Sequence, residues 1–312
     1  MDARQLSSEP FRTSAAAGLE TPDALRGPRY RQVLHGAVQS SALPLTHGAR
    51  VRAFRAVDGD DHVLLGPSAA WALGARFAEP SEPVVVGMDR PHRIRRRAEV
   101  VPHLATLRPE EVVSTAWGLA TGASRTAFDL ARATGTPEVP HDLRVARVDA
   151  VLRATGLPLH EVRDDLVRWR SLRGLRSARD VLADAADGVD SFRETRLRLL
   201  VVRAGLPRPR TQCPVVLDGR RIARLDLGWE ELRVGCEYDG AVHDEPRQYA
   251  VDRARHNEIR LAGWRVLQVD RVMMRRPSRV VDALVTLMRQ QVAAGLGPPH
   301  GDWDVLGLSS AR

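Results

Sequence analysis

The chain contains no lysine, and all 47 of its basic residues are arginines. Arginine stays charged at any useful pH and presents a rigid fork of donors that suits phosphate, but it cannot act as a lysine-type general base. The bias is typical of a GC-rich gene, because lysine has no GC-rich codon. The absence still excludes any mechanism in which a lysine takes the proton.

Cysteines and long apolar runs are also scarce. The two cysteines, Cys213 and Cys236, are too few for a disulfide framework or a cysteine-rich zinc site. No apolar run approaches the roughly 20 residues that span a membrane, and the first residues do not resemble a signal peptide. We therefore expect a cytoplasmic protein with no membrane partner. Its 312 residues leave room for two domains.

The net charge of +8 is concentrated toward the end of the chain. Residues 191–312 hold 21 arginines and 15 acids, a net of +6, whereas residues 1–190 have a net of +2. A basic surface around an acidic pocket suits a phosphodiester enzyme, because arginines hold the backbone and carboxylates hold a metal. The alternative is that coding bias gave arginine-rich surfaces everywhere.

The most informative segment is LDLGWEELRVGCEYDGAVH at 225–243, which reads as two strands joined by a tight turn. With the turn centred on Glu230 and Glu231, Asp226 lies opposite Gly235 and diagonal to Glu237. Alternation then gives two faces. The apolar face carries Leu225, Leu227, Val234, Cys236 and Tyr238, and the other carries Asp226, Gly228, Gly235, Glu237 and Asp239. The two glycines leave the space above the acids empty.

Asp226 and Glu237 on one sheet face predict a shared hard cation, since carboxylate oxygens are the ligands that Mg²⁺ prefers. The alternative is an ordinary solvated face, because antiparallel sheets often have one wet side. The surroundings of the hairpin favour the metal site over that alternative.

The first part of the chain reads as a tail followed by a mixed region. Residues 1–24 are predicted to be a disordered tail, and residues 25–190 a mixed α+β region that is largely helical from 124. Further expectations are a helix at 66–75, a strand at 83–88, a helix or strand-and-turn at 108–120, and helices at 124–134, with Ser124 as N-cap, 144–156, 159–169 and 178–188. The run HRIRRRAEV at 92–100 is expected to be a solvated edge, with phosphate binding as the alternative.

A new domain is predicted from 191 to 294, followed by a tail at 295–312. Ser191 and Glu194 match the S-x-x-E capping box that starts a helix. An Asp-Gly turn at 218–219 then joins two strands. The predicted order is helix, three strands, helix, strand, helix, which gives an α/β (α+β) class with helices covering a sheet.

This order and these acids resemble the PD-(D/E)XK restriction-endonuclease-like core, and more narrowly the very-short-patch-repair-like endonuclease domain. The segments that carry the resemblance are Glu194 in SFRETRLRLL, Asp226 in RLDLGW, EYDGAVH at 237–243, and DRARHNEIRLAGWRVLQV at 252–269. Together they cover about a third of the chain. The region before them loosely resembles regulators of the AbiEi antitoxin type, on LRGPRYRQVLHGAVQ and GPSAAWALGA.

The resemblance implies Mg²⁺- or Mn²⁺-dependent cleavage of DNA, as an endonuclease or nickase. It implies that Asp226 and Glu237 hold the metal, with Glu194 and Asp239 as further ligands. His243 would act as general base or acid, and Arg253 would hold the phosphate.

Each of the four added residues has an ordinary alternative. Glu194 is also a capping residue, Asp239 can shape a turn before Gly240, His243 can lie idle in a loop, and Arg253 can pair with Asp252 or Glu258.

One departure from the family pattern matters. The general motif asks for lysine two residues after the second acid, where this chain has Asp239. The very-short-patch-repair-like branch tolerates an acid there and uses histidine chemistry. The competing hypotheses are a nucleic-acid-binding regulator of antitoxin type that keeps the fold without catalysis, and a purely structural domain.

Overall fold

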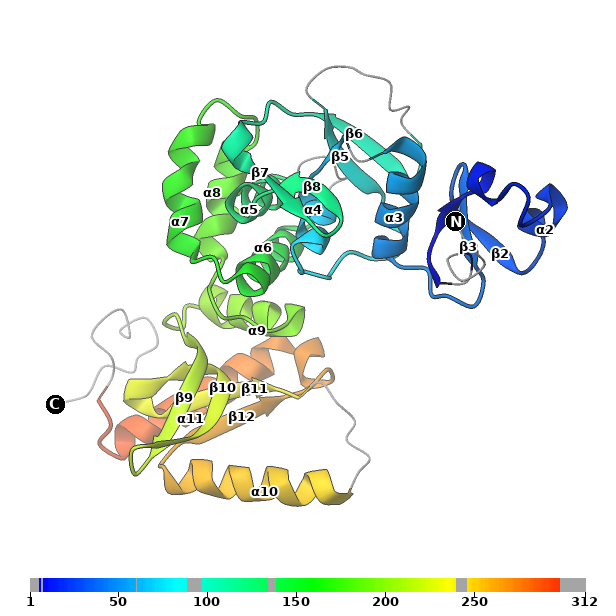
Figure 1. Ribbon diagram of the computed structural model, residues 1–312. Coiled ribbons are helices and arrows are strands. Elements are labelled where there is room, and N and C mark those ends of the chain that lie inside the picture. The colour runs from blue at the N-terminus through cyan, green and yellow to red at the C-terminus, as the bar shows by residue number, and fades with distance from the viewer. Residues whose placement is uncertain are drawn as a thin grey trace. The chain divides into compact units, whose positions relative to one another are not determined.

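The computed structural model describes residue 6 and residues 8–59, 61–88, 97–133, 139–239 and 246–297, with the backbone alone at 88 and 246–252. The chain forms two compact units, Met1–Ala185 (unit 1) and Ala186–Arg312 (unit 2). Both units combine helices with sheets, so the expected mixed class is confirmed at this level (Figure 1). Among the described residues, no helix is both long and apolar enough to cross a membrane.

Unit 1 begins with a small antiparallel sheet of strand order β1-β3-β2. Its strands are β1 (Phe11–Arg12), β2 (Tyr30–Leu34) and β3 (Ala37–Ser40), accompanied by the 3₁₀ helix η1 (Thr13–Ala16) and by α2 (Pro22–Arg26). Phe11 is buried, with its ring 5.6 Å from that of Tyr30. The expectation of a disordered tail at 1–24 is therefore corrected for residues 8–24, because Phe11 and Ala16 are buried in one core cluster with residues of this sheet.

The second sheet of unit 1 has the order β6-β5-β4-β8-β7. Its strands are β4 (Val63–Leu64), β5 (Val84–Met88), β6 (Val100–Leu104), β7 (Val112–Thr115) and β8 (Gly118–Thr121). Helices α3 (His47–Asp58) and α4 (Gly66–Ala72) pack on it, with Phe54 and Leu64 fully buried in the shared core. Strand 83–88 and helix 66–75 match the sequence expectation. Residues 89–96, which hold most of the arginine run at 92–100, lie outside the described residues.

Five helical segments complete unit 1. They are α5 (Ala123–Ala131), α6 (His141–Thr155), α7 (Leu159–Asp165), the 3₁₀ helix η3 (Leu166–Trp169) and α8 (Leu175–Asp184). The helices expected at 124–134, 144–156, 159–169 and 178–188 are thus present with shifted ends. Ser124 is not the N-cap, because α5 is capped at Gly122 and the Ser124 hydroxyl donates to Asp165 at 2.7 Å. Residues 108–120 form a 3₁₀ turn, η2 (Pro109–Glu111), and a hairpin.

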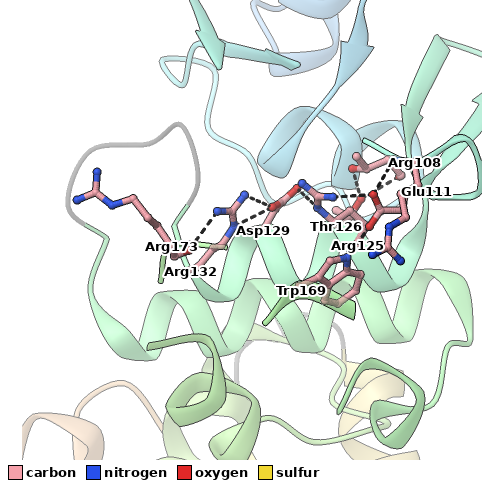
Figure 2. A network of polar contacts seen from close by, with 9 residues as sticks. Arg108, Glu111, Arg125, Thr126, Asp129, Arg132, Trp169 and Arg173 are labelled. Carbon is pink, nitrogen blue, oxygen red and sulfur yellow. Dashed lines mark hydrogen bonds and ion pairs between the residues drawn. The ribbon is translucent and has the colours of Figure 1, made fainter. Parts of the chain in front are cut away.

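A network of buried charges joins these helices to the second sheet (Figure 2). Arg125 is 3% exposed and donates to Glu111 at 2.9 Å and to Asp129 at 3.1 Å. Arg132 donates to the other oxygen of Asp129, and the indole of Trp169 donates to Glu111. Each buried acid of this network therefore has an arginine as its partner.

Unit 2 is built on a four-stranded sheet of order β12-β11-β10-β9. Its elements are α9 (Phe192–Arg203), β9 (Arg210–Leu217), β10 (Arg220–Trp229), the 3₁₀ helix η4 (Glu230–Leu232), β11 (Val234–Tyr238), α10 (Pro246–Leu261), β12 (Arg265–Val269), the 3₁₀ helix η5 (Met273–Arg275) and α11 (Pro277–Ala293). Only the β11–β12 pair is parallel. The order of helices and strands is the one expected from the sequence.

Helices cover both faces of this sheet (Figure 1). On one face Ile259 of α10 packs with Leu225, Cys213 and Trp264. On the other, α9 and α11 pack with Leu227, Val234 and Cys236 through Leu197, Val201, Leu284 and Met288. Cys236 is a fully buried free cysteine, which is the small hydrophobic role expected for it.

Candidate carboxylate site

The turn between β10 and β11 sets which residues face each other. It consists of η4 and Arg233, whose φ of 50° is left-handed. The strands pair Leu227 with Cys236 and Gly228 with Gly235, so the next position places Asp226 beside Glu237. The expected register, with Asp226 opposite Gly235, is wrong because the turn is longer than the two residues assumed. The corrected register puts Asp226 level with Glu237 and no longer diagonal to it.

The glycines do not leave open space, contrary to expectation. A Cβ on Gly228 would lie 2.5 Å from Sγ of Cys213, and a Cβ on Gly235 would lie 2.4 Å from Cδ1 of Leu225. Both glycines are therefore required by close packing on the α10 side of the sheet. A ligand cannot lie above them, and must reach the acids from elsewhere.

Strand β10 loses its regular alternation at Asp226. Leu225 packs on the α10 side and Leu227 on the α9 and α11 side, although residues two apart in a regular strand share a face. The facing residue on β9 is Gln212, whose φ of 48° is left-handed. The single apolar face expected for Leu225 and Leu227 is therefore wrong. The irregular backbone on both strands places Asp226 where regular pairing stops.

Asp226 is half-buried. Its Oδ2 accepts a hydrogen bond of 2.7 Å from the backbone amide of Tyr238 on β11. Burial raises the pKa of Asp226, and the negative charges of Glu237 and Asp190 raise it further, against the opposing effect of that hydrogen bond and of Arg255. Among described residues it forms no ion pair.

Glu194 enters from the first turn of α9 and is 7% exposed. The Ser191 hydroxyl accepts from the Glu194 amide at 3.2 Å, as the capping motif predicts, but the Glu194 carboxylate accepts from Asp190 N at 2.9 Å. Gln212 donates to the same carboxylate at 2.8 Å. Burial raises the pKa of Glu194, and the charge of Asp226 adds to the rise. The capping residue is thus also a neighbour of the acid pair.

Glu237 faces α10. Arg255 of that helix forms an ion pair with its Oε1, and Nε2 of His256 lies 3.9 Å from its Oε2. Arg255 also donates to the backbone carbonyl of Arg224 at 3.4 Å. The side chain of Gln268, paired with Glu237 across β11 and β12, hydrogen-bonds His256. Glu237 is therefore the member of the site that already has a cation beside it.

Three of the predicted site residues remain: Asp239, Arg253 and His243. Asp239 is exposed, and its amide donates to Val269 O at 2.8 Å. Arg253 is exposed on α10, with no described ion-pair partner, and His243 lies outside the described residues. Within the described ranges, no group of three His, Cys, Asp or Glu side chains is arranged to hold a metal ion. Of the predicted site residues that the structure describes, Asp226 lies close to Glu237, and Glu194 lies close to Asp226.

Four neighbours of the acids were not predicted from the sequence: Asp190, Gln212, Arg255 and His256. Arg255 and His256 lie two and three residues beyond the predicted Arg253 on the same helix. The helical pattern alone does not say which face of α10 turns to the sheet. Ile259 and Ala262, both buried, mark that face and offered the available signal.

Comparison with known proteins identifies relatives without an assigned activity. Two uncharacterized proteins, MT2308 and Rv2248, from two strains of Mycobacterium tuberculosis, are each 29% identical to the chain over 152 residues. These matches span 48% of this chain and 54% of each relative, so about half of each relative's length is covered. No protein-family profile and no solved structure matches the chain.

Proposed function

We propose that unit 2 is a metal-dependent nuclease that hydrolyses phosphodiester bonds of DNA, as an endonuclease or nickase. One observation carries the proposal: Glu194, which is buried, and Asp226, which is half-buried, have no described ion-pair partner, and Asp226 lies close to the acid Glu237. Burying uncompensated acids costs free energy, and a bound cation would recover it. Stability alone does not explain such a cluster.

The fold of unit 2 supports the same proposal. The order α9-β9-β10-β11-α10-β12-α11 is the order that the PD-(D/E)XK resemblance implies. In that core, the acids come from the second and third strands and from the preceding helix. Asp226, Glu237 and Glu194 occupy those three elements here.

The donor set suits a divalent cation such as Mg²⁺ or Mn²⁺. Carboxylate oxygens are hard ligands, and burial raises the pKa of Asp226 and of Glu194 by more than their hydrogen bonds and neighbouring cations lower it. Asp226 and Glu237 would hold the ion, and Glu194 would act on it through its negative charge beside Asp226. When bound, such an ion polarises the phosphate and lowers the pKa of a coordinated water.

Residues of α10 supply the remaining chemistry. Arg255 can hold a phosphate oxygen by its guanidinium, but arginine does not serve as a general base. His256, beside Glu237, carries an imidazole, the side chain that most often acts as a general acid or base. His256 thus joins His243, which remains a prediction, as a possible substitute for the absent lysine.

A plasmid-nicking assay tests the proposal. The full chain is incubated with supercoiled plasmid and Mg²⁺ or Mn²⁺, beside Asp226→Asn and Glu237→Gln variants. We expect nicking that EDTA abolishes and that each substitution lowers by at least ~100-fold, because both groups would be direct ligands.

Glu231→Gln is the matched control, since this exposed carboxylate lies in η4 on the same hairpin. It should nick as the parent chain does. Nicking that is absent, independent of metal, or equal in the Asp226→Asn variant would refute the nuclease.

A second function, DNA binding without cleavage, is favoured by one observation. Arg255 already neutralises Glu237, and the lysine position holds Asp239. A regulator of antitoxin type would keep the basic surface and bind DNA in a salt-dependent way. Binding that EDTA leaves intact, with no nicking under any metal, would select this alternative.

A further inference from the structure

A cavity of about 630 Å³ lies in unit 2 beside strand β12. Its size is in the range of ordinary ligand pockets. The polar residues that line it are Arg253, His256, Asn257, Arg260, Arg265 and Gln268. Ile259, Trp264, Val266 and Leu287 add apolar surface. We call it the arginine pocket.

The fold explains why these side chains converge. Arg253, His256, Asn257 and Arg260 are spaced by three, four and seven residues along α10, so they share one face of that helix. Arg265 and Gln268 come from β12, which is an outer strand of the sheet. The pocket is therefore formed where one helix face meets the open edge of the sheet.

The pocket concentrates uncompensated positive charge. Arg253, Arg260 and Arg265 form no ion pair with any residue that the structure describes, and no acid is among the lining residues. Elsewhere in unit 2, Arg224 pairs with Asp190 and Arg255 with Glu237. Three guanidinium groups around one cavity repel each other, and an anion between them would remove that repulsion.

The donors of the pocket suit phosphate in particular. Guanidinium groups present paired donors that match phosphate oxygens, and the amides of Asn257 and Gln268 add neutral donors. Trp264 is 6% exposed, so its ring forms the floor of the pocket and offers no free face for base stacking. Recognition here would be of the backbone and not of the bases.

His256 connects the arginine pocket to the acids. It lines the pocket, and its Nε2 lies 3.9 Å from Oε2 of Glu237. We propose that the arginine pocket holds a backbone phosphate of a nucleic-acid strand whose adjacent part lies at the carboxylate site. This inference rests on the proposed function for its substrate, and it adds where the strand is held.

Fluorescence anisotropy with a labelled single-stranded DNA oligomer tests the pocket. Measured in EDTA, it reports binding alone and excludes cleavage. For the Arg260→Gln/Arg265→Gln variant we expect Kd to rise about 10-fold or more at ~100 mM salt. The slope of log K against log salt should fall in magnitude by about 0.7, the value for one lost phosphate contact on a single strand.

The control is Arg220→Gln/Arg221→Gln, which removes the same charge at the β9–β10 turn and leaves the pocket-lining residues unchanged. Its Kd should stay within about 2-fold of the parent value, and circular dichroism should show both variants folded. Equal losses of affinity in the two variants would refute a specific phosphate site in the pocket and would indicate that DNA binds to positive charge spread over the surface.

Inorganic phosphate and a mononucleotide serve as competitors that distinguish a strand from a small ligand. We expect both to compete only at concentrations far above that of the oligomer. A mononucleotide that binds as tightly as the oligomer, with the same dependence on Arg260 and Arg265, would overturn the strand assignment. Loss of binding in the pocket variant together with absent nicking would refute the proposed nuclease activity but would still support the arginine pocket as a phosphate-binding site.

Discussion

Glu111 and Asp129 of unit 1 are buried against arginines (Figure 2), whereas in unit 2 the buried Glu194 and the half-buried Asp226 lie near other acids. Burial alone would raise the pKa of Glu111. Hydrogen bonds from the Arg108 amide and the Trp169 indole, together with the charge of Arg125, outweigh burial and lower it. In Glu194 and Asp226 the same kinds of contact do not outweigh burial, and the pKa of each stays raised.

The opposite pKa shifts of these acids indicate two different roles for buried charge. A buried acid that is paired and hydrogen-bonded holds elements together, and removing its partner is costly. A buried acid left uncompensated destabilises the fold, and such groups cluster at functional sites because the chemistry needs them. The network of Arg125 is therefore structural, and the cluster of Asp226 is the better candidate for chemistry.

The largest expected effect breaks the paired network. Arg125→Met leaves Glu111 and Asp129 buried without that partner and should lower the free energy of unfolding of unit 1 by about 3–5 kcal/mol. Urea denaturation followed by tryptophan fluorescence measures it.

Arg26→Met is the control, because the Arg26–Asp23 pair is exposed on both sides. Its effect should be near zero. Similar losses in both variants would show that the Arg125 network contributes no more than surface charge.

Acid pH should act in opposite directions on the two units. Burial lowers the pKa of His47 from 6.5 to about 4. As the pH falls from 6.5 to 4, the unfolded chain binds a proton that folded unit 1 excludes. The free energy of unfolding of unit 1 therefore falls by up to about 3 kcal/mol. For Asp226 and Glu194 the pKa in the folded state is raised. Their contribution to the stability of unit 2 is therefore fully present below the ordinary carboxyl pKa, and it is lost as the pH rises through the raised folded-state pKa.

Hydrogen exchange read by mass spectrometry at pH 7 and pH 5, corrected for intrinsic rates, measures the two units separately. Protection in α3 and α4 should fall at pH 5, and protection in β10 should be maintained or rise. His47→Gln should remove most of the fall in unit 1. If protection fell in both units of the parent chain at pH 5, the two units would not differ in their response to acid as expected.

The smallest expected change in the free energy of unfolding has the opposite sign to the change expected for Arg125→Met. Asp226→Asn keeps an oxygen that can accept from the Tyr238 amide and removes the charge. Without divalent metal at pH 7.5 it should stabilise unit 2 by roughly 0.5–1 kcal/mol, a value discounted for partial access of water. Thermal unfolding with and without Mg²⁺ checks this, and a destabilised variant in EDTA would argue for a structural Asp226.

Much of the order of elements could be predicted because local signals marked the ends of elements. Ser191 caps α9, Pro277 begins α11, and the Asp218–Gly219 turn, with φ of 50° and 75°, joins β9 to β10. The short strands of unit 1 near Phe11 and Tyr30 were not predicted. They are held by burial against residues distant in sequence, which leaves no periodic pattern in a two-residue strand.

The acids could be named from the sequence, but their arrangement could not be derived from it. The register depended on a turn that includes left-handed Arg233, and arginine gives no signal for that conformation. The irregular pairing at Gln212 likewise has no signature, so the split between Leu225 and Leu227 was missed. Arg255 was overlooked because choosing it over Arg253 requires the packing of α10 to be known.

Glu194 ties the start of α9 to the acid cluster, since one carboxylate oxygen accepts both from the Asp190 amide and from Gln212. Whatever a cation or a proton does at the cluster is therefore transmitted to the first turn of a helix that begins just after the boundary between the units. The exchange rate of the Asp190 amide becomes a natural reporter of the site. A single backbone proton, bonded to the Glu194 carboxylate, would register each change in the state of the acids.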